Sequence, residues 1–464
     1  MPVSLADVPA LHEWLSPALG RVPDEAVARI DGPRTWWSGP LDVEGLALGS
    51  VQAALSAAQL LFGRASRLSS DAASVASAFD SLGHLRVGGR APEGFAPLSG
   101  YFPTRDGWVR LHANYPQHER ALRAATGATT KTELSRALAE LSAEDVAARV
   151  TEAGGLAVVL RAAAAWRESP MGRAVDEQPW IRFELGEGGR RGLAEQGSLA
   201  GTRVLDLTRV IAGPVATRLL ALFGADVLRV DPPGNPELLD QHIDAGFGKR
   251  SAVADFADPA RLAAVIELAG SADVVVSGYR PGALRRFGLD ARSLRERFPA
   301  LVVVTLDAWG DQGPWGERRG FDSVVQSATG IGERYGRTDE HGSWRPGALP
   351  VQALDHATGY GAAAAALALL ARRRESGAGW AHLCLARTAH LLLDLEVPEQ
   401  TRRELAGAEG EAASSFGPLR FALPPVFADG ARLDYRSVPG PYGADPLAWA
   451  SRAGRASRPL TSGL

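Results

Sequence analysis

Residues 203–306 alternate short apolar strands with helical stretches, and this alternation restricts the fold more than any other feature of the chain. The strand-like segments are RVLDL at 203–207, DVLRV at 226–230, DVVV at 273–276 and LVVVTL at 301–306. Helical stretches separate them, at 212–223, 259–269 and 291–297. Apolar strands joined through helices are typical of a parallel sheet covered on both faces. We therefore predict a doubly wound, mostly parallel, Rossmann-like α/β domain over residues 201–395.

The segment ELGEGGRRGLAEQGSLA at 184–200 is rich in glycine and charge and has no apolar period, which predicts a linker. Before it, residues 1–183 combine helical spacing at 46–62 and 131–153 with an alternating strand at 107–113. This half is expected to be a smaller α+β domain. Residues 396–464 are expected to form a C-terminal extension that packs on the core.

Composition favours a small-molecule role. The 50 Lys and Arg residues nearly balance the 53 Asp and Glu residues, so no basic field favours nucleic acid or an anionic membrane. Cys384 is the single cysteine, which excludes an internal disulfide, and Cys/His spacing typical of structural zinc is missing. The first residues lack a secretory pattern, and the alanine-rich run at 361–371 is too short to span a bilayer. We expect a cytoplasmic protein.

Ligands of open α/β sheets bind at the carboxyl ends of strands, and the first such turn here is TRVIAGP at 208–214. It has neither the G-x-G-x-x-G spacing of a dinucleotide site nor a P-loop, so an NAD-dependent dehydrogenase gains no support. The structural alternative is that Gly213 and Pro214 only start a helix.

Two later loops could contact phosphate or a purine. GFGKRS at 246–251 places Lys249 in what we expect to be a flexible loop before a strand, and SGYRPG at 277–282 places Tyr279 beside a cation. Arg286 follows in a short helix. The alternative is a solvated basic pair and an ordinary turn.

Asp355 follows the apolar segment LPVQAL and precedes the helical stretch HATGYGAAAAALALLARRR, which is the position of a helix N-cap. The helix dipole would keep a carboxylate there ionised, as a nucleophile requires. Gly359 and Gly361 would leave room for a bulky ligand. The alternative is that Asp355 is only a structural cap.

These motifs occur together in a known order. The chain reads VLDLTRVIAGPVATRLLALFGADVLRVDPP, then GKRS, RPGALRRFGL, GDQGPWGERRGFDSVVQSATG and the Asp355 segment. This series resembles CoA-transferase family III, the CaiB/BaiF type, which includes formyl-CoA transferase, carnitine CoA-transferase and α-methylacyl-CoA racemase. The resemblance covers roughly residues 200–395.

The resemblance implies a role for each matching residue, with acyl-CoA as substrate and neither a metal nor a tightly bound cofactor. Asp355 would be the catalytic carboxylate, and Gly88 with Gly89 would form a shortened glycine loop over the acyl group, whose backbone N–H groups stabilise the oxyanion. The residues that would line the CoA pocket or contact its nucleotide end are Arg209, Val210, Ile211, Ala212, Lys249, Tyr279, Arg286 and Arg319.

Residues 88–118, GGRAPEGFAPLSGYFPTRDGWVRLHANYPQH, resemble a part of the family that normally follows the motifs above. The two halves of the chain are thus expected to be rearranged. Family members form interlocked homodimers, so we expect a homodimer, with the interlocked form depending on chain order.

The implied activity is transfer of CoA from an acyl-CoA to a carboxylic acid through an aspartyl-CoA thioester. A racemase of the α-methylacyl-CoA type is an alternative, although Phe321 stands where racemases carry histidine. His356, beside Asp355, is expected to have a packing or capping role. A non-catalytic acyl-CoA-binding protein is a third possibility.

Overall fold

A seven-stranded sheet forms the centre of the computed structural model, which describes residues 8–34, 37–63, 67–187, 189–399 and 407–450. Six strands run parallel, and the edge strand β7 is antiparallel to its neighbour β15. Their spatial order is β10 (Lys249–Val253), β9 (Asp226–Asp231), β8 (Arg203–Leu207), β11 (Val274–Ser277), β12 (Val302–Asp307), β15 (Gly379–Cys384) and β7 (Arg182–Leu185). The prediction of a mixed α/β fold with a mostly parallel sheet is confirmed.

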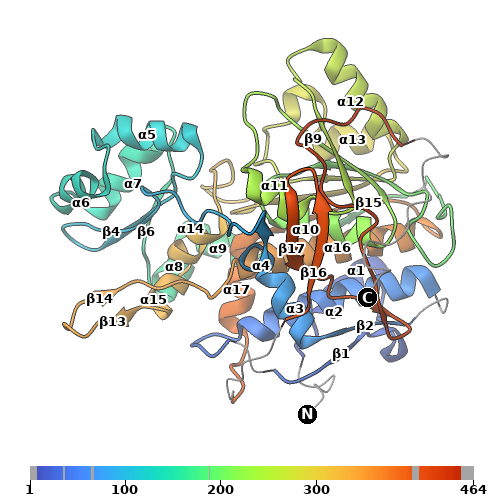
Figure 1. Cartoon of the computed structure of the whole chain (residues 1–464), viewed down its shortest axis with the longest axis horizontal. Helices are drawn as coiled ribbons and strands as arrows, with labels where there is room; N and C mark the ends of the chain where they lie inside the picture. Colours follow the sequence, from blue (N-terminus) through green and yellow to red (C-terminus); the bar gives the residue numbers. More distant parts are fainter. Residues whose placement is uncertain (1–7, 35–36, 64–66, 188, 400–406, 451–464) are drawn as a thin grey trace.

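Alternate residues of these strands enter two separate apolar cores. Val204, Val274 and Val302 belong to the larger core, whereas Leu205 and Val275 belong to the smaller one. The larger core receives helices α10 (Ala212–Leu222) and α16 (Ala353–Arg373), and the smaller one receives α12 (Pro259–Ser271) and α13 (Ala291–Arg297). Both faces of the sheet are therefore covered, which explains why its strands are apolar throughout (Figure 1).

A long apolar helix from the N-terminal half, α2 (Val43–Phe62), packs along α16. The Asp42 carboxylate caps α2 by accepting the Gly45 N–H at 2.9 Å. The length and apolarity of α2 would suffice to cross a membrane, but most of its surface is buried inside the protein. Burial against α16 therefore accounts for its composition.

A separate subdomain, which we call the small subdomain, carries its own core over residues 98–159 (Figure 1, left). Its three-stranded antiparallel sheet consists of β4 (Gly100–Pro103), β5 (Trp108–Leu111) and β6 (Ala157–Val159). Its helices are α5 (Pro116–Thr126), α6 (Lys131–Ala139) and α7 (Ala143–Glu152). We predicted one helical stretch at 131–153, and the structure breaks it into two because Ser142 starts a new helix by accepting the Asp145 N–H.

Strands from the two ends of the described chain pair with one another. β17 (Gly417–Ala422) lies between β16 (Glu409–Ser414) and β3 (Arg86–Val87). β18 (Phe427–Ala428) lies between β2 (Leu68–Asp71) and β19 (Ala431–Arg432), and β1 (Arg29–Asp31) completes that sheet. Residues 407–435 are thus built into the N-terminal part of the fold.

Candidate active site

Asp355 lies inside α16 as its third residue, and the N-cap position belongs to Gln352, whose side chain makes no capping bond. Our prediction that Asp355 is the N-cap was therefore wrong. The cap comes from a different element: Asp322, the first residue of α14 (Asp322–Ala328), accepts the Asp355 N–H at 3.0 Å. Gln326 Nε2 in turn donates to the other oxygen of Asp322. The hydrogen bond that an N-cap side chain normally accepts from a backbone N–H of the first turn is thus accepted by a residue outside the helix.

The Asp355 carboxylate, by contrast, has no hydrogen bond or ion pair with any residue that the structure describes, although the residue is only 6% exposed. Two other buried carboxylates of the described chain are paired with cations. Lys249 and Thr217 bind Asp206, and Arg373 binds Asp273 at 3.0 Å. A buried carboxylate without a partner is costly to retain, which points to a role other than stability.

The protonation of Asp355 also differs from our expectation. Burial, together with the nearby Asp322 carboxylate, raises the pKa of Asp355 well above its usual value. We expected the start of the helix to keep this group ionised, but loss of hydration and the like charge outweigh the dipole. Gly359 and Gly361 do not provide ligand clearance either, because a Cβ atom on Gly359 would meet Ala212 O at 2.4 Å and one on Gly361 would meet the Trp180 ring. Both glycines serve helix packing.

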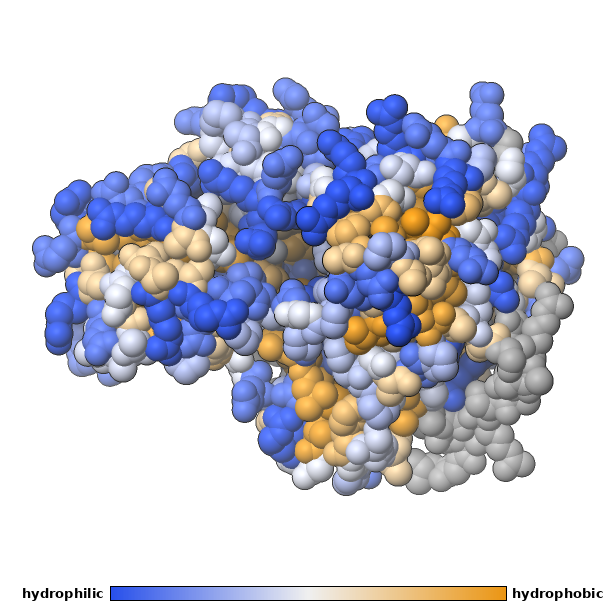
Figure 2. All heavy atoms as spheres, turned by 90° about the horizontal axis from the view of Figure 1, so that it is seen from above, coloured by the Kyte–Doolittle hydropathy of each residue, from blue (hydrophilic) through white to orange (hydrophobic). Residues whose placement is uncertain are grey.

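Asp355 lines a cavity of about 520 Å³, which we call the main cavity. Its walls come from the segment 90–96, the end of β5, the turn between β8 and α10, helix α11 (Leu239–Ala245) and the first residues of α14 and α16. Figure 2 shows the small subdomain, at left, set off from the main body by a recess. The cavity thus gathers residues from both halves of the chain, and its acidic lining residues are Glu93, Asp240, Asp322 and Asp355.

The turn between β8 and α10 contributes Val210 and Ile211, two of the residues predicted to line a CoA pocket, to the main cavity. Val210 has a φ of 68°, a conformation that a β-branched residue adopts only at a cost. Its N–H donates to Glu237 Oε2 at 2.7 Å, and Tyr115 of the small subdomain donates to Glu237 Oε1 at 2.6 Å. A buried network between the two parts of the molecule therefore holds this strained turn in place.

The other two residues predicted from this turn do not line the main cavity. Ala212 is buried at the start of α10. The Arg209 guanidinium donates to the carbonyl oxygens of Asn235 and Pro236, at 2.7 and 3.0 Å, and lies over the Tyr115 ring. Arg209 therefore secures the wall of the site.

Lys249 contradicts our prediction of a nucleotide contact in a flexible loop. It begins β10, is buried, and points into the core, where Nζ donates to Thr217 Oγ1 at 2.6 Å and to Asp206 at 3.2 Å. Burial lowers its pKa to about 8, against the opposing effect of Asp206. The lysine neutralises a buried carboxylate and cannot reach a ligand without leaving that carboxylate unpaired.

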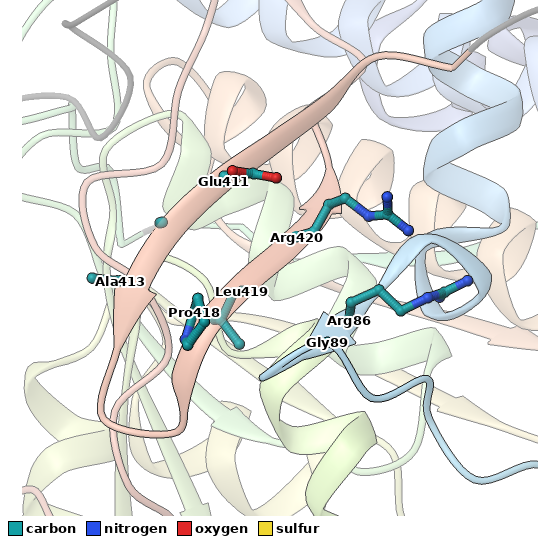
Figure 3. Close-up of a pocket in the computed structure, with 8 residues that line it drawn as sticks. Arg86, Gly89, Glu411, Ala413, Pro418, Leu419 and Arg420 are labelled. Atoms are coloured by element: carbon teal, nitrogen blue, oxygen red, sulfur yellow. The ribbon is translucent and has the colours of Figure 1, made fainter.

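Gly88 and Gly89 form a tight turn and do not cover Asp355. Their φ angles are 58° and 83°, and Val87 pairs with Arg90 across them in a two-residue hairpin. The Gly88 N–H donates to Pro418 O at 2.8 Å, so it is not available to an oxyanion. Gly89 lines a different, open pocket beside the β16–β17 hairpin, with Arg86 and Arg420 (Figure 3). The segment that does reach the main cavity is 90–96.

The remaining predicted residues lie outside the main cavity. Tyr279 packs half-buried against the smaller apolar core, and Arg286 stacks on Phe287, 4.5 Å from the ring centroid. Arg319 lines a separate cavity of about 150 Å³ together with Arg280 and Arg318. The structure therefore places Arg319 in a basic cluster with Arg280 and Arg318, and Arg319 does not line the main cavity.

Two residues of the main cavity were missed by sequence reasoning, His112 and Asn114 of the small subdomain. The His112 ring stacks on Phe321 with centroids 4.0 Å apart, and its Nδ1 atom is buried without a partner among the described residues. Burial lowers its pKa to about 3, which keeps the ring neutral. Asn114 Oδ1 accepts from Ser99 Oγ at 2.6 Å, which fixes the side-chain amide. His112 lies in the strand predicted at 107–113 and Asn114 directly follows it, so polar residues at the end of that strand were the available signal.

Comparison with known proteins gives the site a family. Residues 199–415 match the model of CoA-transferase family III. This part of the chain is a domain of CoA-transferase family III. It contains Asp355, Asp322 and the turn with Val210, whereas His112 and Asn114 lie outside it.

Relatives of the family III domain include a probable fatty acyl-CoA transferase of Mycobacterium tuberculosis, 35% identical over 192 residues, which are 39% of this chain and 48% of the relative. A succinate–glutarate CoA-transferase of Agrobacterium fabrum is 35% identical over 199 residues, 39% of this chain and 49% of the relative. The chain thus spans about half the length of the curated relatives it matches. A crystal structure of the M. tuberculosis protein superposes with a TM-score of 0.38 at 35% identity, over 42% of this chain and 54% of that one.

Proposed function

We propose that the protein transfers CoA from an acyl-CoA to a carboxylic acid, with Asp355 as the nucleophile. One observation carries the proposal: a buried carboxylate without a partner lines an open cavity within a family III domain. Asp206 and Asp273, two buried carboxylates that the structure describes, are paired with Lys249 and Arg373, whereas Asp355 has no such stabilising contact. Relatives named as CoA-transferases, among them the acetyl-CoA:oxalate CoA-transferase of Acetobacter aceti, support acyl-CoA and a carboxylate as the substrates.

The reaction would proceed through an aspartyl-CoA thioester, with a mixed anhydride formed before it and another after it. A carboxylate oxygen of Asp355 attacks the thioester carbonyl, the C–S bond breaks, and CoA leaves as thiolate from a mixed anhydride. The thiolate then attacks the aspartyl carbonyl, which releases the donor acid and leaves an aspartyl-CoA thioester. The acceptor carboxylate attacks that thioester, and the returning thiolate takes the acceptor acyl group and frees Asp355. The aspartyl-CoA thioester is about as activated as the donor and product thioesters, so the overall transfer is nearly reversible.

The residues around Asp355 would supply the remaining requirements. His112 and Asn114 replace the glycine pair as candidate donors to the tetrahedral oxyanion. A neutral imidazole and a fixed amide are suited to this task because they donate without the cost of burying a full charge. One such donor is typically worth about 3 kcal/mol in the transition state. Because Asp355 must ionise before it attacks, the first half-reaction should accelerate as pH rises toward its raised pKa.

A racemase-type activity is the second candidate, and His112 is the observation in its favour. A neutral imidazole and a carboxyl group with a raised pKa line the same cavity, which is a base and an acid facing one substrate. His112 could take the proton next to the thioester carbonyl while Asp355 returns one. The His112 ring stacks on Phe321, and Phe321 occupies the position at which racemases carry a histidine.

Trapping separates these activities. The full chain would be incubated with succinyl-CoA and, separately, acetyl-CoA, each with a free acid acceptor and then hydroxylamine. Peptide mass spectrometry should find a hydroxamate at Asp355, and Asp355→Asn should lose it together with transfer. Turnover with an unmodified Asp355 would refute the mechanism. Deuterium exchange next to the thioester carbonyl without transfer would select the racemase, and CoA binding with neither activity would indicate a binding protein.

A further inference from the structure

A second, smaller cavity adjoins the main cavity, and we call it the side cavity. Its volume is about 200 Å³. The residues that line both cavities are Leu82, Val210, Ile211, Gln241 and Gln352. A volume of this size holds about six or seven non-hydrogen atoms, taking about 30 Å³ for each as for water. The side cavity is therefore suited to a short chain that extends past Asp355.

The walls of the side cavity combine an apolar surface with a polar patch. Phe79, Val215 and Val351 supply apolar side chains, while His356 and Gln241 supply polar ones. The Phe79 ring stacks on His356 at a centroid distance of 5.1 Å, which fixes the orientation of the imidazole. The cavity can therefore take a methylene chain and a polar group beyond it.

Two buried polar atoms of this cavity have no hydrogen-bond partner within the described residues, His356 Nδ1 and Gln241 Oε1. His356 is only 3% exposed. Two other buried histidines are bonded, His382 Nε2 to Asp307 at 2.8 Å and His390 Nδ1 to Asp176 at 2.7 Å, whereas His112, His118 and His242 also have a buried Nδ1 without a partner among the described residues. Unsatisfied buried polar atoms are rare because each loses its hydration, and two on one small cavity indicate a ligand that hydrogen-bonds to them.

The charge of the side cavity restricts that ligand further. Asp80 and Asp244 line it, and none of its described lining residues is lysine or arginine. Asp244 is already engaged by Ser81 Oγ at 2.7 Å and by Arg218. A second carboxylate on the ligand would therefore meet the Asp80 carboxylate, while the nearby Arg218 is already paired with Asp244. Gln241 Oε1 can only accept a hydrogen bond, so the ligand must donate one.

We propose that the side cavity binds the far end of a short acyl chain that carries a neutral hydrogen-bond donor, a hydroxyl or amide, held by Gln241 Oε1 and His356 Nδ1. This inference rests on the proposed function, since it takes acyl-CoA as the ligand of the main cavity. His356, expected from the sequence to pack or cap, becomes a residue that determines acyl specificity.

Three probes of similar length test the proposal on the full chain: 4-hydroxybutyryl-CoA, butyryl-CoA and succinyl-CoA. We expect kcat/KM for 4-hydroxybutyryl-CoA to exceed that for butyryl-CoA at least about tenfold, the ratio that corresponds to about 1.4 kcal/mol. Succinyl-CoA should be the poorest of the three. The hydroxyl preference should fall to about 1 in His356→Phe and in Gln241→Met, and should persist in the matched control His341→Phe, whose ring is exposed on the surface.

Failure of the subsite and failure of the function give different results. Equal rates with 4-hydroxybutyryl-CoA and butyryl-CoA, or a preference for succinyl-CoA, would overturn the side cavity proposal. A hydroxamate at Asp355 in the same experiment would still support the transferase function. If no probe is turned over, calorimetric binding of the same three thioesters decides. A preference for the hydroxyacyl probe that His356→Phe removes would then support the subsite, and equal affinities would refute it.

Discussion

Replacing Asp355 with asparagine should stabilise the folded protein, and the gain should increase with pH. The fold raises the pKa of Asp355 above 3.8, so the folded state binds its proton more tightly than the unfolded state does. The contribution of this proton is fully present below 3.8 and is lost as pH rises through the folded-state pKa. Asparagine keeps the shape but has no charge to bury.

The size of the effect follows from linkage. Within the window between the unfolded and folded pKa values, the free energy of unfolding of the wild type should fall relative to Asp355→Asn by up to about 1.4 kcal/mol for each pH unit. Guanidinium unfolding at pH 5, 6, 7 and 8 would measure it. Glu152→Gln, an exposed change on α7, is the control and should stay parallel to the wild type.

A companion variant isolates the like-charge contribution. Asp322→Asn keeps an oxygen that can accept the Asp355 N–H but removes the second carboxylate. In Asp322→Asn the folded-state pKa of Asp355 should be lower than in the wild type, though still above its usual value. The pH at which the Asp355 proton stops stabilising the fold should therefore be lower in this variant. Parallel stability curves for the wild type and Asp355→Asn at every pH would refute the claim that the fold holds this carboxyl group protonated.

Three further changes test the surrounding structure. Lys249→Met leaves Asp206 buried and unpaired and should lower the free energy of unfolding by about 3–5 kcal/mol in thermal or denaturant melts. The affinity of the folded fraction for CoA should stay unchanged, and a selective loss of CoA binding would instead support the predicted contact of Lys249 with the nucleotide. Tyr115→Phe removes the bond to Glu237 and should cost about 1–3 kcal/mol, with an unaltered melt counting against the network. His112→Leu should reduce kcat on the order of a hundredfold or more if it is an oxyanion donor, and a change in KM alone would show that it only binds substrate.

The sequence was sufficient for the mostly parallel sheet, because the apolar periodicity of its strands is local. It failed where a distant residue decides the role of a local one. Lys249 looks free beside a loop, but its partner Asp206 lies on another strand. The start of α16 looks self-capped, yet Asp322, 33 residues upstream, accepts its N–H.

The glycine pair and the missed histidine illustrate two other limits. Gly88–Gly89 fits a loop over a ligand and a two-residue hairpin equally well, and only the pairing of Val87 with Arg90 distinguishes them. His112 belongs to a subdomain with its own core, so no spacing within the sequence relates it to Phe321. Its role depends on how the small subdomain sits against the sheet.

The pairing of β3 with β17 and of β2 with β18 affects how the chain can be synthesised and folded. Ser70 Oγ, for example, donates to the carbonyl of Pro425, 355 positions further along. During translation β2 and β3 therefore lack their partners β18 and β17, and keep an unpaired edge, until nearly the whole polypeptide has left the ribosome. The N-terminal segment should consequently need a chaperone or its early contact with α16 to avoid aggregation, and truncation before residue 417 should yield insoluble protein even though Asp355 is retained.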